Sequence, residues 1–188
     1  MSTYYTSLTF NALQKETGCG TNRYPIRKNT KAAEDLLRDC SIVLSDHGIE
    51  VILLFGSLLG YYRSNSLIPH DVDMDIGIIG EDNLHKVHNL INNGSFFKKN
   101  ILAIKDREFS LYRDNFYVDI YPFITTDNVK YISRLGYPQY YLTNDDLPLQ
   151  KIKFLDTNFS TVHDIEKYLT SRYGENWTEP KENHGAKF

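Results

Sequence analysis

The sequence predicts an α+β fold in which flanking helices pack on a mixed, mostly antiparallel sheet. Three patterns lead to this prediction: a helical periodicity over residues 31–46, several short apolar or alternating runs in the middle of the chain, and a second helical periodicity near the carboxyl end. The 188 residues are 41% hydrophobic, which is enough for one core, and no repeat or linker divides them. We therefore expect a single domain over residues 1–188, with its core at about 31–178, an arm at 1–28 and a tail at 179–188.

A helix followed by a buried strand opens the predicted core. Residues Lys31–Asp46 place apolar side chains on one helical face, Asn29 or Thr30 can cap the amino end, and Gly48 can end the helix. The next apolar run, Glu50–Phe55, is predicted as a buried strand. The chain would thus enter the following turn from the interior of the sheet.

A turn of small residues follows this strand. Gly56-Ser57 leads into Leu58–Arg63, which can form a short helix. Because glycine has no Cβ, backbone amides at the start of such a helix can approach and bind an anion, and the Ser57 hydroxyl can add a donor. Arg63, about two turns along the helix, can reach a phosphate or pair with a carboxylate. On its own the turn is weak evidence, because most Gly-Ser pairs simply connect a strand to a helix.

Three alternating carboxylates come next. Asp71, Asp73 and Asp75 are separated by single apolar residues, so a strand here would place all three acids on one face. Like charges in that arrangement repel, and a bound cation would relieve the repulsion. A solvated edge strand is the alternative, but aspartate is depleted in strands. A calcium loop of EF-hand type does not fit, because its sixth and twelfth positions would be Ile76 and Asp82. The pattern therefore favours a metal site.

The rest of the chain continues the α+β pattern. Glu81–Asn92 is predicted as a second helix, closed by Asn93-Gly94. Alternating segments then predict strands near Ile101–Lys105, Phe109–Arg113 and Phe116–Tyr121. A carboxyl-terminal helix is expected from about Thr161 to Tyr173. These elements would complete a sheet with helices packed on it.

Four motifs, in this order, resemble the LicD and fukutin family of phosphotransferases, which belongs to the nucleotidyltransferase-fold superfamily. They are Gly56-Ser-Leu-Leu-Gly-Tyr-Tyr-Arg63, Ile68-Pro-His-Asp-Val-Asp-Met-Asp-Ile-Gly77, Tyr117-Val-Asp-Ile-Tyr-Pro-Phe123 and Tyr168-Leu-Thr-Ser-Arg-Tyr-Gly-Glu-Asn-Trp177. The departures are mild: Ser57 replaces the commoner Thr, His70 stands where Trp is usual, and Val72 replaces an Asp. None of them removes a residue that would bind metal.

The resemblance implies a nucleotidyltransferase-type fold and a set of site residues. It assigns catalysis and metal binding to three carboxylates, which are Asp73, Asp75 and Asp119. It assigns binding of the donor phosphates to three residues of the turn and helix, which are Gly56, Ser57 and Arg63. Asp71 is a supporting member of the acidic set. If only the first two carboxylates bind metal, Asp119 could instead act as general base toward an acceptor hydroxyl.

The activity implied by the resemblance is metal-dependent transfer of a phosphorylated small alcohol, such as phosphocholine or ribitol phosphate, from a CDP-linked donor to a glycan hydroxyl. Mg²⁺ suits the acidic set because it prefers oxygen ligands and usually keeps waters and substrate phosphates, and Mn²⁺ could replace it. Two alternatives stay open: a nucleotidyltransferase of the same fold that transfers the nucleotide itself, and a non-catalytic regulator that binds metal or a glycan. The mutually repelling carboxylates favour an enzyme.

The acceptor has one candidate contact region in the sequence. A tyrosine-rich segment could stack on a base or a sugar, and its members are Tyr131, Tyr137, Tyr140 and Tyr141. Tyrosine is also common in the packing of half-buried sheets. The segment is therefore a hypothesis for acceptor recognition.

Charge and composition argue against other classes. The net charge is −3 and no basic run exceeds Lys98-Lys99, so nucleic acid is not an expected partner. Two cysteines, Cys19 and Cys40, are too few for a structural zinc site. The amino terminus lacks the pattern of a signal peptide, and no stretch approaches the ~20 apolar residues of a membrane span. We expect a cytoplasmic protein.

Overall fold

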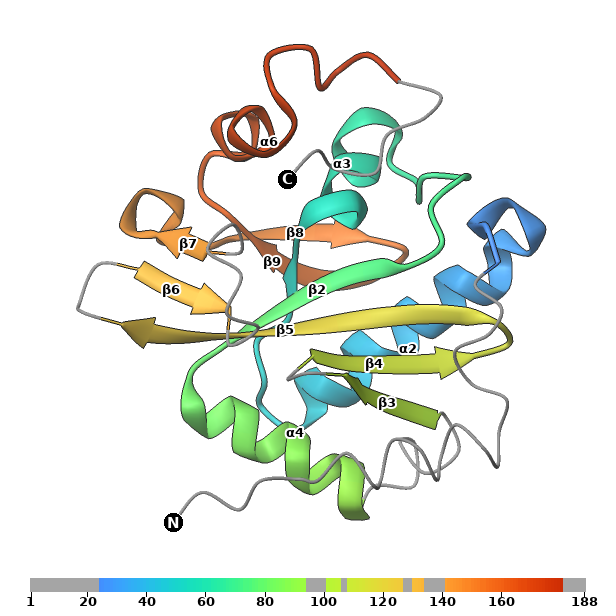
Figure 1. The fold of residues 1–188 in the computed structure, drawn as a ribbon, viewed down its shortest axis with the longest axis vertical. Coiled ribbons are helices and arrows are strands. Elements are labelled where there is room, and N and C mark those ends of the chain that lie inside the picture. Colours follow the sequence, from blue (N-terminus) through green and yellow to red (C-terminus); the bar gives the residue numbers. More distant parts are fainter. Residues whose placement is uncertain (1–23, 94–100, 106–107, 127–129, 134–140, 181–188) are drawn as a thin grey trace.

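The computed structural model describes residues 24–93, 101–105, 108–126, 130–133 and 141–180, and Figure 1 shows a sheet with helices around it. The strands are β1 (Ile52–Leu53), β2 (Met74–Ile79), β3 (Ile101–Lys105), β4 (Glu108–Arg113), β5 (Phe116–Thr126), β6 (Lys130–Ser133), β7 (Tyr141–Thr143), β8 (Gln150–Phe154) and β9 (Thr157–Thr161). They form one nine-stranded sheet in the order β3-β4-β5-β2-β1-β9-β8, with β6 paired to β5 and β7 to β6. The pairs β1–β9 and β2–β5 are parallel and the other pairs are antiparallel, which confirms the predicted mixed sheet.

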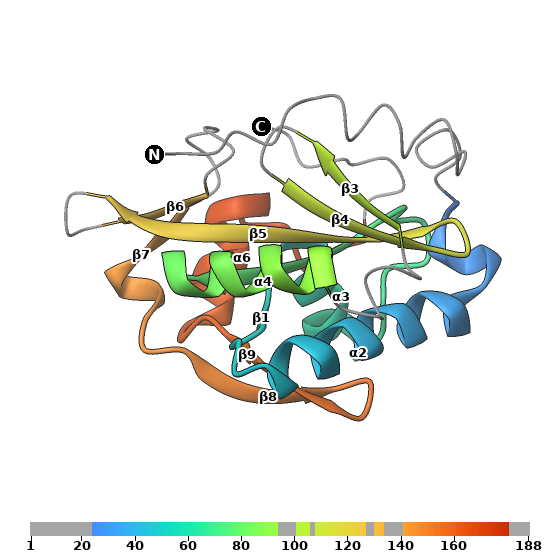
Figure 2. The same ribbon diagram turned by 90° about the horizontal axis from the view of Figure 1, so that it is seen from below.

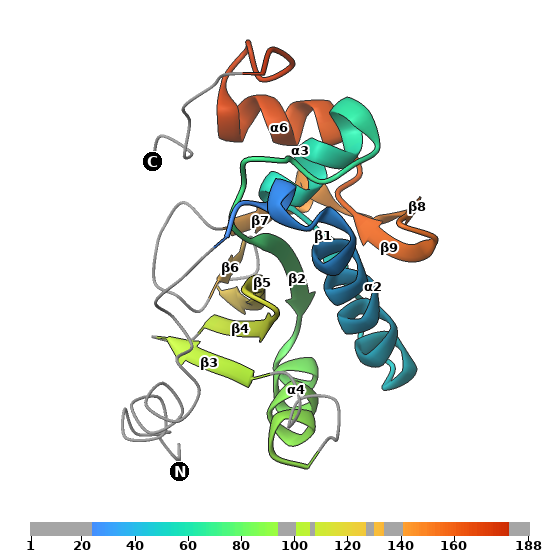
Figure 3. The same cartoon turned by 90° about the vertical axis from the view of Figure 1, so that its right-hand side faces the viewer.

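The helices lie around the sheet. They are α2 (Thr30–Asp46), α3 (Phe55–Ser64), α4 (Glu81–Asn93) and α6 (Ile165–Tyr173), with short 3₁₀ turns η1 (Ile26–Lys28) and η2 (Asn144–Asp146). Helix α2 packs against β5 and β9, α4 packs against β2, and Figure 2 places both helices on the same side of β5. Helices α3 and α6 lie together at one end of the sheet (Figures 1 and 3). Among the described helices, none is both long and apolar enough to cross a membrane.

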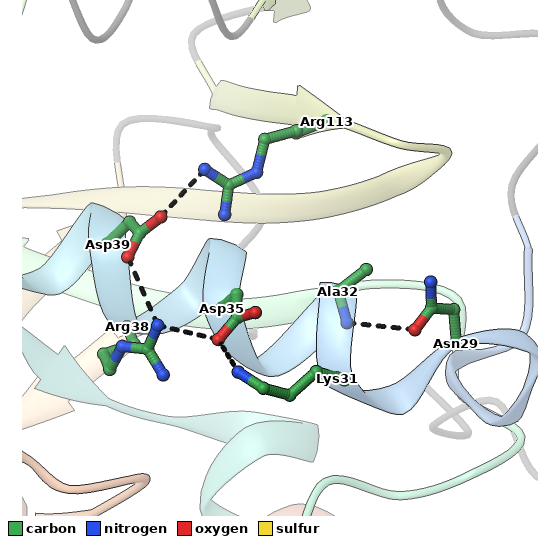
Figure 4. A network of polar contacts seen from close by, with 7 residues as sticks. All are labelled: Asn29, Lys31, Ala32, Asp35, Arg38, Asp39 and Arg113. Atoms are coloured by element: carbon green, nitrogen blue, oxygen red, sulfur yellow. Dashed lines mark hydrogen bonds and ion pairs between the residues drawn. The ribbon is translucent and has the colours of Figure 1, made fainter.

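Helix α2 forms as the sequence predicts. The Asn29 side chain caps it by accepting a hydrogen bond from the Ala32 N–H at 3.2 Å. Its polar face carries the chain of ion pairs in Figure 4, in which Arg38 contacts both Asp35 and Asp39. The chain of contacts ends on the sheet, because Arg113 of β4 donates to the Asp39 carboxylate at 2.9 Å. The helix is thus tied to the end of β4 as well as packed on the core.

Two hairpins turn through residues in the left-handed region. Asp114-Asn115 has φ values of 53° and 69° and joins β4 to β5. This turn lies between the two strands that the sequence predicts near Phe109–Arg113 and Phe116–Tyr121. Leu155-Asp156 has φ values of 50° and 59° and joins β8 to β9. Two consecutive left-handed residues match the twist of a hairpin. The sequence reading did not include the second hairpin.

The carboxyl-terminal helix begins later than predicted. Helix α6 starts at Ile165, because the Asp164 side chain caps it by accepting from the Lys167 N–H at 3.0 Å. Thr161 belongs to β9 instead, and its hydroxyl donates to the Leu53 carbonyl at 3.1 Å. The predicted start at Thr161 was therefore wrong. A long-range contact with the sheet outweighed the helical pattern.

The first strand is shorter than predicted and the helix after it is longer. Strand β1 covers only Ile52–Leu53, and α3 already begins at Phe55, three residues before the predicted start at Leu58. Within α3, Gly60 is required by close approach, because a Cβ there would lie 2.4 Å from the Ser66 carbonyl oxygen. The chain after α3 is therefore pressed against the helix, which brings the acidic loop back toward the start of α3.

Helices α3 and α6 are joined by aromatic and polar contacts. The Tyr62 hydroxyl donates to the Glu166 carboxylate at 2.5 Å. The Tyr62 ring also packs edge-on against Trp177 at 5.5 Å between centroids, and the Trp177 Nε1–H donates to the Thr170 hydroxyl at 2.9 Å. Trp177 therefore packs the end of α6 against the body of the protein. These contacts hold α6 beside α3.

Candidate active site

Two of the predicted carboxylates face each other across neighbouring strands. Asp75 of β2 and Asp119 of β5 are register partners, and Ser110 of β4 is the next partner along the same row. Partners in adjacent strands place their side chains on the same face of a sheet. The Ser110 hydroxyl donates to the Asp119 Oδ1 atom, and both side chains are buried. The sheet thus brings Asp75 and Asp119 together, as the sequence predicts.

The other two acids do not lie on a strand. Strand β2 begins at Met74, so Asp71 and Asp73 lie on the loop before it, and the predicted alternating strand through all three acids was wrong. The reason is a competing partner: the Ile26 N–H donates to the Asp71 carbonyl at 2.8 Å. The segment at η1 therefore takes the hydrogen bond that a longer strand would have used. That segment belongs to the arm expected at residues 1–28.

The carboxylates of Asp71 and Asp75 meet at Gly56. The Gly56 N–H donates to Asp75 Oδ2 at 3.1 Å. A Cβ on Gly56 would lie 2.9 Å from Asp71 Oδ2 and 3.3 Å from Asp75 Oδ2, so any side chain here would collide with the acids. The predicted anion-binding amide therefore contacts a carboxylate. Asp71, which the sequence marked only as a supporting residue, is as close to this turn as Asp75.

Ser57 holds the backbone of Asp75. Its Oγ accepts a hydrogen bond from the Asp75 N–H at 2.8 Å, and the serine is 3% exposed. Together with the bond from Gly56 to the Asp75 carboxylate, this makes a reciprocal pair, which we call the Asp75 clamp. A serine that accepts here retains its own hydroxyl proton for donation. The structure thus gives Ser57 a positioning contact, and its predicted contact with a donor phosphate stays a prediction.

Tyr121 is a site residue that the sequence reading missed. Its hydroxyl donates to Asp75 Oδ1 at 3.3 Å, and its ring packs edge-on against Phe55 at 5.0 Å between centroids. A usable signal existed, because Tyr121 lies two residues after Asp119 and therefore on the same face of β5. Ser110 was also missed, and no motif in the sequence marks it.

The acidic cluster is electrostatically strained. Burial, and then the neighbouring charge of Asp73, raise the pKa of Asp71 to about 6, against the smaller opposing effects of His70 and Arg63. Burial also raises the pKa of Asp75 well above its ordinary value, and the charges of Asp73 and Asp119 add to the rise. The Gly56 N–H acts in the opposite direction but does not cancel these effects. The folded protein therefore favours a proton or a cation at this place.

Arg63 lies at the other end of α3, in its last turn. Its Nη2 donates to the Glu179 carbonyl at 3.2 Å, and burial lowers its pKa while the charge of Asp71 raises it. Within the described part of the chain, Arg63 makes no ion pair within 4 Å. It is therefore near enough to act on Asp71 electrostatically without being paired to it, and phosphate binding by Arg63 stays a prediction.

The acidic cluster suits a hard cation by its chemistry. In the described residues, no group of three or more His, Cys, Asp or Glu side chains is gathered tightly enough to hold an ion by itself. Magnesium does not need such a cage, because it is usually bound by one or two carboxylates together with water and substrate phosphates. Asp71 and Asp75 provide two carboxylates that bracket one glycine. The donor set thus fits Mg²⁺, while Mg²⁺ binding itself stays a prediction.

The tyrosines considered for acceptor contacts lie outside the part of the chain whose side chains are described. Tyr137 and Tyr140 fall in residues 134–140, and Tyr131 and Tyr141 are described only as members of β6 and β7. Their proposed contact with an acceptor therefore stays a hypothesis.

A known protein family matches the part of the chain that contains the Gly56 turn and the acids. Residues 48–161 match the model of the LicD/FKTN/FKRP nucleotidyltransferase domain, a segment that contains the Gly56 turn, the acidic loop and Asp119. The chain belongs to this family. The expected resemblance is therefore confirmed, and the nucleotidyltransferase-type fold with it.

Relatives of the LicD-family chain include longer proteins. An uncharacterized protein of Caenorhabditis elegans is 34% identical over 98 residues, which are 52% of this chain and 24% of that protein. An uncharacterized protein of Rickettsia typhi is 31% identical over 135 residues, which are 70% of this chain and 42% of that protein. The chain thus spans less than half the length of these curated relatives.

A solved structure also shows a limited likeness. The lincomycin-bound lincosamide antibiotic adenylyltransferase LnuA is 15% identical, with a TM-score of 0.48, and the match covers 69% of this chain and 79% of that one. A likeness of this size does not bear on the function of the LicD-family chain.

The Asp75 clamp predicts that loss of the Ser57 hydroxyl destabilises the folded protein. Ser57→Ala leaves the Asp75 N–H without its acceptor, so we expect the free energy of unfolding to fall by about 1–3 kcal/mol. Ser57→Thr keeps the hydroxyl and serves as the matched control, with a smaller loss. Urea denaturation of the three proteins measures the difference. Equal stability of Ser57→Ala and the wild type would contradict the clamp.

The strained acids predict a gain in stability when one charge is removed. In the metal-free protein at pH 7.5, Asp75→Asn should raise the free energy of unfolding, on the order of 1 kcal/mol, because a buried charge among like charges is lost. The amide can still accept from Gly56 and donate to Tyr121. Thermal denaturation with a chelator present measures the change. A less stable Asp75→Asn protein would contradict the strain.

The same acids predict how stability depends on pH. Their pKa values are raised in the folded state, so the folded protein binds protons that the unfolded chain releases, and stability rises as the pH falls from 8 toward 5.5. Asp71, with a pKa of about 6, titrates inside this window. The rise should be smaller in Asp75→Asn. If the stability of the metal-free wild type and of metal-free Asp75→Asn depended on pH in the same way, the pKa of Asp75 would not be raised in the folded state.

Proposed function

We propose that this LicD-family chain transfers a phosphorylated small alcohol from a CDP-linked donor to a glycan hydroxyl. The observation that carries the proposal is the meeting of the Asp71 and Asp75 carboxylates at the Gly56 amide, at the start of α3. A helix amino terminus and a pair of acids suited to a cation are the two components that bind a diphosphate. Family membership supports the reaction class.

The proposed cofactor is Mg²⁺, with Mn²⁺ as a substitute. Asp73 and Asp75 are its proposed ligands, Asp71 is a further candidate because it brackets Gly56, and Asp119 is the proposed third carboxylate. A bound divalent cation supplies neutralisation of the charge that develops on the transferred phosphoryl group. The raised pKa values of Asp71 and Asp75 support this proposal, since both report a place where positive charge is favoured.

The protein's own groups would orient the reactants. We propose that the phosphates of a donor contact the start of α3, where the Gly56 N–H is bonded to Asp75 in this structure. The Ser110 hydroxyl holds one oxygen of Asp119 and fixes the direction of the carboxylate. If Asp119 does not bind metal, its other oxygen could accept the proton of the acceptor hydroxyl. Phosphoryl transfer rests mainly on such positioning and on charge neutralisation.

Product analysis tests this function. The protein is incubated with Mg²⁺, a mixture of glycans as acceptors and, in turn, CDP-choline, CDP-ribitol, CDP-glycerol and CTP. The nucleotide products and the modified glycans are separated by liquid chromatography with mass detection, and a reaction without glycans measures hydrolysis of each donor. We expect release of CMP from one CDP-alcohol, and a loss of at least about 100-fold in Asp75→Asn, because a group that acts on the reacting phosphate is removed. Asp145→Asn, which removes an exposed acid elsewhere, is the matched control.

Other outcomes separate the remaining interpretations. Pyrophosphate released from CTP, without CMP from any CDP-alcohol, would identify nucleotide transfer instead. Binding of Mg²⁺ by thermal shift without turnover of any donor would favour a non-catalytic regulator. Turnover that is the same in Asp75→Asn and the wild type would sink the assignment of the site.

A further inference from the structure

Arg172 is a cation on α6 to which no motif assigns a role. It lies in the last turn of α6, and its Cζ is 5.7 Å from the centroid of the Phe55 ring and 5.3 Å from that of the Tyr168 ring. Phe55 directly precedes Gly56 in the chain. The stack therefore holds a positive charge against the first residue of α3.

A chain of contacts links this arginine to the acids. Arg172 lies over the Phe55 ring, Phe55 packs edge-on against Tyr121, and the Tyr121 hydroxyl donates to Asp75. Burial raises the pKa of Tyr173, the charge of Asp75 raises it further and the charge of Arg172 lowers it, so Asp75 and Arg172 both act on the same phenol. The cation and the acids thus border one region at the end of the sheet.

Arg172 adds a positive charge to a region that is rich in negative charge. Four acids gather there, which are Asp71, Asp73, Asp75 and Asp119. A diphosphate donor would bring more negative charge to the same place, so cations must neutralise it on more than one side. Arg63 on α3 and Arg172 on α6 come from the two helices that lie together at this end. Helix α6 therefore contributes charge as well as packing.

The way Arg172 is held also suits anion binding. A guanidinium is planar, and stacking on aromatic rings fixes the direction of that plane, which suits bidentate hydrogen bonding to a phosphate. A purely structural role is available, because a cation in the last turn interacts favourably with the helix dipole. However, Lys167 on the same helix is exposed and paired with Asp145, whereas Arg172 is half-buried against rings that border the site.

We propose that Arg172 binds the phosphate of the departing nucleotide, together with Arg63. The identity of that nucleotide as CMP rests on the proposed function. The role of Arg172 in binding a phosphate does not depend on the proposed function, because any diphosphate donor at this site would present the same charge.

Binding measurements on the full chain with Mg²⁺ test the proposal. The dissociation constants of cytidine, CMP and CDP are measured by calorimetry and ligand-observed NMR for the wild type, Arg172→Gln, Arg172→Lys and Lys167→Gln. We expect Arg172→Gln to weaken CMP and CDP about tenfold or more while leaving cytidine unchanged, because only the phosphate contact is lost. Arg172→Lys should recover part of the affinity. Lys167→Gln removes the same charge from the exposed side of α6 and should change nothing.

Three results would overturn the proposal. The first is unchanged CMP affinity in Arg172→Gln. The second is an equal loss in Lys167→Gln, which would indicate a general effect of charge. The third is a parallel loss for cytidine and CMP, which would indicate a structural role.

A wild-type protein that binds no cytidine nucleotide would count against the proposed function, and the same variants are then titrated with ATP and inorganic pyrophosphate. A loss confined to Arg172→Gln with either probe would uphold phosphate binding by Arg172 with another donor. Failure of the wild type to bind any of these phosphates would overturn both proposals.

Discussion

The site depends on two reciprocal hydrogen bonds between the start of α3 and the start of β2. The Gly56 N–H bonds the Asp75 carboxylate, and the Asp75 N–H bonds the Ser57 hydroxyl. Because β2 pairs in parallel with β5, fixing Asp75 also fixes its distance from Asp119. Tyr121 adds a third hydrogen bond to Asp75, the second to its carboxylate. A helix terminus, two strands and an aromatic ring are therefore positioned relative to one side chain.

This arrangement places function and stability in opposition. Asp75 is buried among other acids, and burial with like charges raises its pKa, so the metal-free protein holds it at a cost in stability. The turn before it adds backbone strain, because Phe55 has a φ of 46°, in the left-handed region. Strain of both kinds is common where a site is organised before its ligand binds. The surrounding sheet and the α3–α6 contacts supply the rigidity that holds it in place.

Much of the fold could be predicted because its signals are local. The Asn29 cap, the helical periodicity after it and the alternation of β4 and β5 all reside in neighbouring residues. Non-local contacts caused the errors. The bond from Ile26 to the Asp71 carbonyl ends the strand pattern before β2, and no local pattern shows it. The β8–β9 hairpin turns through Leu155-Asp156 instead of a common Asn-Gly pair, so its turn was not recognised.

The sequence motifs named some of the residues that meet at the candidate site, but not all of them. The motifs named Gly56, Asp75 and Asp119, which the structure brings together, and the roles of these residues stay predictions. Tyr121 lies within a quoted motif but was not assigned to the site, and Ser110 lies in no motif. The central claim is that a divalent cation binds where Asp71 and Asp75 meet at Gly56. Anomalous diffraction from crystals soaked in Mn²⁺ tests it most directly. The account predicts a manganese peak in contact with the Asp75 carboxylate, and well-diffracting crystals with no peak there, or with manganese bound only elsewhere, would contradict it.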